Sequence, residues 1–304
     1  MLLVLISLQR YREIFIYRNN SNVAAVNSEF WAKILATLAI SKVLMETLAC
    51  LDIYLYLCSR KSLTHPKRMN GNAQAQVGFQ VGDLLYTTLT DSQVSVIGLA
   101  CENTTTIIIP SQIDYDHHTY VVSQIGEKAF ANCSRLTSIT IPESVEEIGY
   151  YAFWCCSALT SIQVMAENTV YDSRNGCNAL IHSATHTLIA GCKTTIIPRD
   201  VTTIEAGAFS ECSGLKSIVI PEGVTTIGDW AFHGCLALRT IALPKTLRVI
   251  GDWAFHNCSS LLSVNLPEGV TEIGDFAFWG CNRLQSVRLP KTVTYLGEDA
   301  IPGV

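Results

Sequence analysis

Apolar and polar positions along most of this chain recur every 23 residues. Each unit reads Ile-Gly-x-x-Ala-Phe-x-x-Cys-x-x-Leu-x-x-Ile-x-Ile-Pro-x-x-Val, as in the stretch from Ile125 to Val145. Its last two isoleucines, Ile139 and Ile141, alternate with polar neighbours, which is the period of a half-buried strand. The proline that follows ends the strand, because it cannot donate to a strand ladder. The pattern predicts one such strand per unit, and the opening isoleucines are Ile125, Ile148, Ile204, Ile227, Ile250 and Ile273.

Alanine, phenylalanine and cysteine fill the part of the unit that returns from one strand to the next. One unit cannot bury these side chains alone, so we expect stacked units to form a solenoid with a continuous core. The predicted fold class is therefore mainly β, and the 23-residue period lies within the ~20–29 residues typical of leucine-rich repeats. The Ala-Phe pairs are Ala129-Phe130, Ala152-Phe153, Ala208-Phe209, Ala231-Phe232, Ala254-Phe255 and Ala277-Phe278.

The period is interrupted once, within residues 165–195. Phe153 and Phe209 lie 56 residues apart, which is one period plus 33. The surplus contains two short apolar runs on either side of Ser183 to His186. Two runs separated in this way are typical of a hairpin. We expect this hairpin insert to protrude from one coil or to widen it.

The two ends of the chain also depart from the repeat. Residues 76–124 carry alternating apolar runs without Ala-Phe, and we expect them to form an N-terminal β cap. The solenoid is then predicted over 125–304, and its last unit stops at Ala300-Ile301 without a C-terminal cap. In residues 1–75, Ala73-Gln-Ala75 resembles the cleavage site of an export signal, but the segment before it is polar and basic. Three interpretations stay open for this leader: a misassigned start, a poorly formed signal or membrane segment, or an amphipathic helix packed on the solenoid.

Composition narrows the classes of partner. Charged residues make up 15% of the chain and the net charge is −5, so no basic stripe is available for nucleic acid. Contact with a membrane is expected only through residues 1–75, if at all, since charges interrupt their apolar runs. No nucleic-acid partner is therefore predicted.

Half of the twelve cysteines form one column of the repeat. Because packing space sets this column, we expect buried thiols rather than disulfide bridges there. Cys177 and Cys192 could bridge the insert instead. No CxxC motif occurs, so the zinc signature is absent. The column consists of Cys133, Cys156, Cys212, Cys235, Cys258 and Cys281.

Polar residues that alternate with the buried strand residues are expected to lie on one face of the solenoid. With adjacent coils ~4.8 Å apart, they would form continuous rows of hydroxyl groups. These rows either solvate the sheet or form part of a ligand site, and the first interpretation is favoured. The pairs are Ser138/Thr140, Ser161/Gln163, Ser217/Val219, Thr240/Ala242, Ser263/Asn265 and Ser286/Arg288.

Aromatic residues and histidines flank the Ala-Phe pair in four units. Because Ala and Phe point inward, their neighbours are expected to point partly outward, in two columns along one edge. Such a patch is a candidate ligand-binding surface, since rigid rings supply contact area at small entropic cost. The alternative is that adjacent coils cover each ring and the columns only stiffen the stack. The candidate residues are Tyr151, Trp230, Trp253 and Phe276 in one column, and Trp154, His233, His256 and Trp279 in the other.

Catalytic, cofactor and metal sites are not predicted. No Cys-His or Ser-His-Asp arrangement can be assigned, and single glycines at repeat turns do not make a phosphate-binding loop. Two imidazoles one repeat apart, His233 and His256, lack a third ligand column. The adjacent His117 and His118 would point to opposite faces of a strand. The chain is therefore not expected to be an enzyme.

Units such as Ile227-Gly-Asp-Trp-Ala-Phe-His-Gly-Cys235, continuing to Pro244, resemble the BspA-like leucine-rich repeats of bacterial surface proteins. Val170-Tyr-Asp-Ser-Arg-Asn-Gly-Cys-Asn-Ala-Leu-Ile181 is similar to an insert of that family, and Phe79 to Tyr86 to its first mature strand. The resemblance covers roughly residues 76–304. It implies an exported protein, in several members an adhesin for host matrix proteins or other bacteria, and no catalytic chemistry.

Two functions are expected on these grounds. The first is a secreted or cell-surface interaction protein that binds a protein or glycan through the solenoid surface. The second is an assembly module that stacks on another chain through its uncapped C-terminal coil, since a bare coil end exposes apolar surface.

Overall fold

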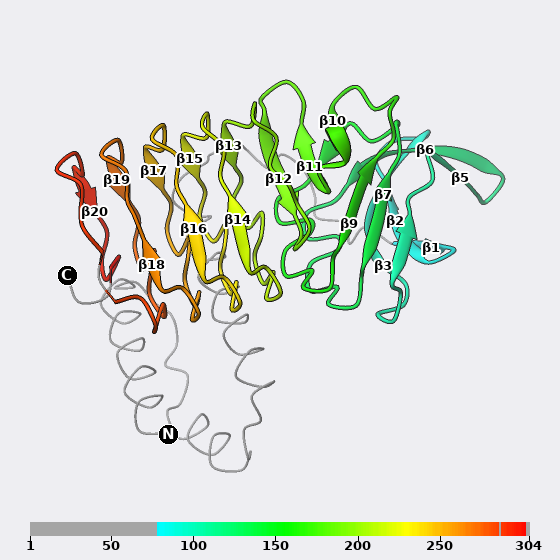
Figure 1. The fold of residues 1–304 in the computed structure, drawn as a ribbon. Coiled ribbons are helices and arrows are strands. Elements are labelled where there is room, and N and C mark those ends of the chain that lie inside the picture. Colours follow the sequence, from blue (N-terminus) through cyan, green and yellow to red (C-terminus); the bar gives the residue numbers. More distant parts are fainter. Residues whose placement is uncertain (1–77, 286, 302–304) are drawn as a thin grey trace, which may run out of the picture. The chain divides into compact units, whose positions relative to one another are not determined.

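Residues 78–285 and 287–301 are described by the structure, a computed structural model. They form a solenoid whose coils follow one another from the cyan strands to the red strand (Figure 1). All of their regular elements are strands except one 3-10 turn, η1 (Arg174–Gly176), so the mainly β prediction is confirmed. Within these ranges no helix has the length and apolar character needed to cross a bilayer. The predicted leader, residues 1–75, lies outside the described part of the chain.

The N-terminal strands form a curved sheet with mixed pairing. Strands β1, β2 and β3 are an antiparallel meander, and β6 continues the sheet parallel to β3. On the other side β5 pairs with β6 in an antiparallel hairpin that projects from the solenoid, while β8 pairs parallel to β6 (Figure 1). The bounds are β1 Phe79–Val81, β2 Leu84–Thr88, β3 Gln93–Leu99, β5 Gln112–Tyr115, β6 His118–Ile125 and β8 Glu147–Ile148.

For five of the six units the predicted strand lies in one of two three-stranded parallel sheets, whereas no strand is formed at the described residues 287–289 of the unit that opens at Ile273. The first has the order β4-β7-β9 and the second the order β14-β16-β18. Both pair in the register of the repeat, for example Ser217 with Thr240 and then Ser263. The bounds are β4 Thr106–Ile108, β7 Ser138–Ile141, β9 Ser161–Val164, β14 Ser217–Val219, β16 Thr240–Ala242 and β18 Ser263–Val264.

A separate sheet of eight strands lies along the other side of the coils, and its first strands belong to the insert. The hairpin β11–β12 is antiparallel, and β12 then pairs in parallel with β13 of the next coil. Thus the predicted hairpin is present and it widens one coil, since it joins the ladder instead of leaving it. The bounds are β10 Tyr171–Asp172, β11 Ala179–His182, β12 Thr187–Gly191, β13 Thr203–Ile204, β15 Thr226–Ile227, β17 Val249–Ile250, β19 Glu272–Ile273 and β20 Tyr295–Leu296.

Where the insert begins, side-chain hydrogen bonds take the place of the interrupted backbone pairing between strands. The Asn168 amide donates to the carbonyls of Pro142 and Val145 at 2.8 and 2.9 Å, and its oxygen accepts from the backbone of Val170 and Tyr171. The Tyr171 hydroxyl accepts from the Ile148 backbone N–H, at the end of β8, at 3.0 Å. These bonds matter because an unpaired buried backbone group costs as much as a lost hydrogen bond.

The phenylalanine column forms the centre of the core in two stretches. Phe209, Phe232, Phe255 and Phe278 stack with ring centroids 5.0–5.2 Å apart. An earlier pair, Phe130 and Phe153, stacks at 5.6 Å. The insert separates the two stretches, and Gly191 at its end lies against Phe209, where a Cβ would be 2.1 Å from the ring. The core accordingly forms two clusters of buried residues. One contains residues between Leu84 and Cys192, the other contains residues between Cys177 and Ile301, and both include residues of the insert.

The cysteine column lies beside these rings as free thiols. The Cys235, Cys258 and Cys281 thiols donate to the carbonyls of Phe209, Phe232 and Phe255 in the preceding coil, at 3.2–3.3 Å. Burial raises the pKa of the Cys235 and Cys258 thiols well above the usual value. Cys177 and Cys192 are also free, so they do not bridge the insert.

In the units that open at Ile148, Ile227, Ile250 and Ile273, the close approach of neighbouring coils requires the glycine. A Cβ on Gly251 would lie 2.4 Å from the Asp229 carboxylate and 2.6 Å from the Asp229 backbone nitrogen. That carboxylate accepts the backbone N–H of Asp252 at 2.9 Å, so the same contact links the turns of successive coils. Glu205 replaces the glycine in the coil that follows the insert, where its N–H pairs with Leu188 of strand β12 instead.

Candidate functional site

Three parallel rows of side chains cross the coils on the face of β14, β16 and β18. They comprise a basic rim, a hydroxyl row and an apolar row, and we call them together the strand-face strip. Sheet register aligns the rows from β14 onward, since Ser217 pairs with Thr240 and Val219 with Ala242. Residues 193–196 lie outside this sheet, one 23-residue period before β14, and a Cβ on Gly214 would lie 3.4 Å from Lys193 Cδ. The basic rim is Lys193, Lys216 and Arg239; the hydroxyl row is Thr194, Ser217, Thr240 and Ser263; the apolar row is Ile196, Val219 and Ala242.

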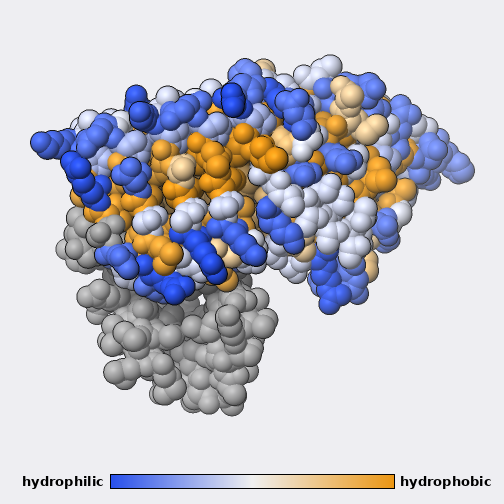
Figure 2. Space-filling view, in the orientation of Figure 1, coloured by the Kyte–Doolittle hydropathy of each residue, from blue (hydrophilic) through white to orange (hydrophobic). Residues whose placement is uncertain are grey.

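The apolar row is unusually exposed for β-branched residues. Ile196 and Val219 retain 75% and 73% of their accessible surface, while Ile197 and Ile218 beside them point inward and are buried. Figure 2 shows a band of apolar surface over this part of the solenoid, bordered by hydrophilic residues. A grouped apolar surface with a polar border is typical of an interaction site.

The basic rim runs along one side of this apolar row. Lys193, Lys216 and Arg239 are exposed, and within the described ranges no carboxylate forms an ion pair with any of them. The rim follows the coils, since the Arg239 backbone N–H donates to the Lys216 carbonyl at 3.1 Å. The strip therefore presents a positive edge on a protein whose net charge is −5, so the expectation that no basic stripe is present is wrong for this face.

The sequence predicted Ser217, Thr240 and Ser263 of the hydroxyl row and Val219 and Ala242 of the apolar row, but Thr194, Ile196 and the basic rim were missed. Ile196 lies 23 residues before Val219, and Lys193 lies 23 before Lys216. The insert hides this register, because the coil that contains Ile196 lacks the Ala-Phe signature. Counting back by one period from Val219 and from Lys216 would have found Ile196 and Lys193.

Parts of the two aromatic columns form stacks. Trp230 lies parallel to Trp253, with centroids 5.0 Å apart and planes 2° apart, and Trp253 stacks on Phe276 at 4.5 Å. His233 lies 5.0 Å from His256 in the second column. Each member of the first column has a left-handed backbone, with φ of 61°, 59° and 55° for Trp230, Trp253 and Phe276. Equal backbone angles aim successive rings in the same direction.

The sequence predicts that these rings are partly exposed, and for most of them this prediction is wrong. Exposed fractions are 5% for Trp154, 2% for Trp230, 5% for Trp253, 2% for His233 and 8% for His256, because neighbouring rings cover each other. Tyr151, Phe276 and Trp279 are half-buried. Gly207 and Ser210 interrupt the two columns, and a Cβ on Gly207 would touch both Trp154 and Tyr151. A ligand-binding role for the eight residues stays a prediction.

The two stacked histidines have no metal-binding arrangement around them. Within the described ranges no three His, Cys, Asp or Glu side chains come together as a metal site would require. His233 Nδ1 lies 3.2 Å from the Glu211 carboxylate. Burial and, second, the neighbouring His233 hold the pKa of His256 well below its ordinary value. The neutral form of the His256 imidazole is therefore the one that fits the stack.

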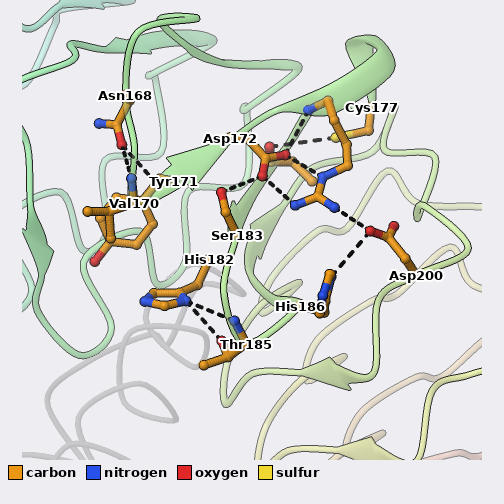
Figure 3. A network of polar contacts seen from close by, with 12 residues as sticks. Asn168, Val170, Tyr171, Asp172, Cys177, His182, Ser183, Thr185, His186 and Asp200 are labelled. Carbon is orange, nitrogen blue, oxygen red and sulfur yellow. Dashed lines mark hydrogen bonds and ion pairs between the residues drawn. The ribbon is translucent and has the colours of Figure 1, made fainter.

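An ionic cluster fixes the insert to the next coil (Figure 3). Arg174 donates to Asp172 through Nε at 2.6 Å and also contacts the Asp200 carboxylate, while Ser183 donates to Asp172 at 2.6 Å. Burial raises the pKa of Asp172, but hydrogen bonds from Arg174 and Ser183 outweigh it, so the pKa lies below its usual value. His186 Nδ1 lies 3.2 Å from Asp200. The charges satisfy one another, which indicates a structural clamp.

Two shallow cavities lie away from the strip and the aromatic columns. One of about 270 Å³ is formed by the N-terminal strands around Leu84 and Ile108. The other, of about 220 Å³, lies beside Tyr171 and Arg174 of the insert. Neither contains a candidate residue of the sequence analysis, and each is smaller than the ~300–1,000 Å³ usual for small-molecule sites.

The repeat matches a known family, described as the BspA type leucine rich repeat region, in six copies over residues 99–180 and 179–303. A leucine-rich repeat protein of Bacteroides ovatus is 32% identical, with a TM-score of 0.50, and the match covers 72% of this chain and 55% of that one. The chain thus spans about 55% of that relative's length.

Two other solved structures match the chain at lower identity. A leucine rich cell surface protein of Faecalibacterium prausnitzii is 20% identical, with 73% of this chain and 91% of that one covered and a TM-score of 0.46. A pneumococcal vaccine antigen is 16% identical, with 73% and 85% covered and a TM-score of 0.47. No curated protein matches the chain. Its repeats, and the family match over more than half of its length, show that this chain belongs to the BspA-type leucine-rich repeat family.

Proposed function

We propose that this protein is a non-catalytic interaction protein, secreted or displayed on the cell surface, that binds a macromolecule through the strand-face strip. The exposure of Ile196 and Val219 beside a basic rim that has no ion pair among the described residues carries the proposal. Burying such a side chain fully against a partner is worth ~1.5–3 kcal/mol. The surface location follows from what the resemblance to BspA-like proteins implies, and adhesion to a host or bacterial macromolecule is the corresponding role.

The strip is a better binding surface than the aromatic columns because its side chains are available. Ile196 and Val219 are mostly exposed, whereas Trp230 and Trp253 already pack against other rings. A partner could cover the strip without any change in the fold. Reaching the buried tryptophans would require the coils to separate.

The test is binding of the full chain to an array of purified matrix proteins and glycans. Val219→Glu places a charge in the centre of the strip, and we expect it to abolish the binding that the wild type shows. Ile108→Glu is the matched control, since Ile108 is also a β-branched residue at an outward position of a parallel strand and is 72% exposed. Equal binding by all three proteins would contradict the proposal.

A second candidate, stacking through the last coil, is favoured by one observation. Leu296 of β20 is 41% exposed, although Ile227, Ile250 and Ile273 at the same position in earlier coils are fully buried. Covering Leu296 with a second chain would complete the column. Light scattering over a concentration series tests this, with Leu296→Glu as the variant, and a monomer at every concentration would contradict it.

A further inference from the structure

We infer that the ligand of the strand-face strip is an amphipathic α-helix with carboxylates along one flank, lying along the solenoid axis. The inference rests on the proposed function and specifies its partner.

Charge is the first argument. Lys193, Lys216 and Arg239 place positive charge on the same side of three coils, and no carboxylate pairs with them in the described part of the chain. On the other side of the apolar row, Arg199, Glu222 and Lys245 alternate in sign. Therefore only the flank formed by the basic rim carries charges of a single sign, and only this flank selects a ligand of opposite charge. A ligand with carboxylates on that flank gains both attraction and a fixed orientation.

The apolar row excludes a purely polar ligand. Ile196 and Val219 gain free energy only when apolar groups replace water around them. Their branched aliphatic side chains have no aromatic face on which a sugar ring could stack. The row also decreases in size, from isoleucine to valine to Ala242. A complementary ligand carries its bulkiest apolar residue over Ala242.

Backbone hydrogen bonding separates a helix from an extended strand. A strand binds by pairing with a free sheet edge, but the strip lies on a sheet face, where β14, β16 and β18 already pair with one another. An extended peptide on this face would leave its own backbone groups unpaired. A helix satisfies its backbone internally and can present side chains alone.

The spacing of the rows also suits a helix. Adjacent coils are ~4.8 Å apart, so three coils span ~9.6 Å. Two turns of an α-helix rise ~10.8 Å, which brings residues i, i+4 and i+7 over successive coils with small deviations. Same-side residues of an extended strand recur every ~6.6 Å and are ~3.6 Å out of register after two coils. An aspartate or glutamate at matching positions on the flank would face the three basic residues.

Selection from a displayed library of random peptides against the full chain tests the inference. We expect enriched sequences to carry apolar residues at i, i+4 and i+7 and acidic residues along one flank. By fluorescence anisotropy, Val219→Glu should weaken a selected peptide at least ~10-fold and Lys216→Glu ~3–10-fold, the latter effect shrinking at high salt. Ile108→Glu should leave the affinity unchanged. A proline in the middle of the peptide should abolish binding.

Other outcomes would overturn the inference and can be told apart. Enrichment of basic or non-helical sequences, or no enrichment, would reject the acidic helix as ligand. Binding of polygalacturonate that Val219→Glu abolishes would also reject the helix, yet it would keep the strip as a binding site. Selected peptides that ignore Val219→Glu would reject the strip itself, and the proposed function with it.

Discussion

Replacing Trp253 by alanine distinguishes the two roles considered for the aromatic columns. The indole is 5% exposed and contacts Trp230, Phe276 and His256 at ring-centroid distances of 5.0, 4.5 and 4.7 Å. If the column stiffens the stack, the substitution removes a buried ring that has neighbours on both sides. If it binds a ligand, the substitution removes a contact surface instead.

The expected loss follows from this packing. Substitution of a buried tryptophan by alanine costs ~3–5 kcal/mol, including the ring contacts. For a domain of this size 1 kcal/mol shifts the Tm by ~2–4 °C, so a decrease of ~6–20 °C is expected. Left-handed backbone strain does not change, because alanine and tryptophan tolerate that region about equally poorly. Val219→Ala serves as the control, since surface substitutions usually stay within ~0.5 kcal/mol.

Thermal unfolding of the full chain and variants, followed by circular dichroism, gives the decisive comparison. A Tm of Trp253→Ala within about 2 °C of the wild type would refute the structural reasoning, because a buried ring cannot be removed at so small a cost. If such a stable variant also lost ligand binding, the aromatic columns would be the binding site. A large decrease in Tm with unchanged ligand affinity of the folded protein would assign them to the stack.

Three further predictions follow from the repeat. In urea titrations, Gly251→Ala should lower the free energy of unfolding by about 3 kcal/mol, because its methyl group clashes with the preceding coil. Gly82→Ala, which has open space around it, should lower it by only ~1 kcal/mol. Equal losses would contradict the close approach of the coils. Iodoacetamide should label the exposed Cys101 in the native protein and spare Cys258 until guanidine is added, as read by mass spectrometry. Because burial depresses the pKa of His256, its contribution to stability should be constant above the unfolded pKa of ~6.5 and fall below it, as the unfolded chain binds the proton first. His256→Leu should reduce this acid slope, and an unchanged slope would exclude His256 as its source.

Much of the fold follows from one period of the sequence. Residues such as Ile227, Phe232 and Cys235 recur at fixed positions because each coil must offer the same interior to its neighbours. The strands of five units, the buried phenylalanine stack and the hairpin insert were all predictable on that basis. The hydroxyl row was predictable too, since a strand alternates its two faces.

The site was less accessible for reasons that belong to tertiary structure. Alternation shows which way a strand residue points, but Trp230 and Trp253 lie in turns, where the backbone angle decides the direction. Their left-handed φ values stack them on each other. Likewise Ile196 belongs to the strip only because the insert returns the chain to the register of the coils.

The sequence by itself determined the repeating unit, its interior and its family, because burial demands the same apolar side chain in every coil. Only the tertiary structure decided which surface is left for a partner. Exposure depends on contacts between coils, and those contacts cover the tryptophan column but leave Ile196, Val219 and the basic rim uncovered.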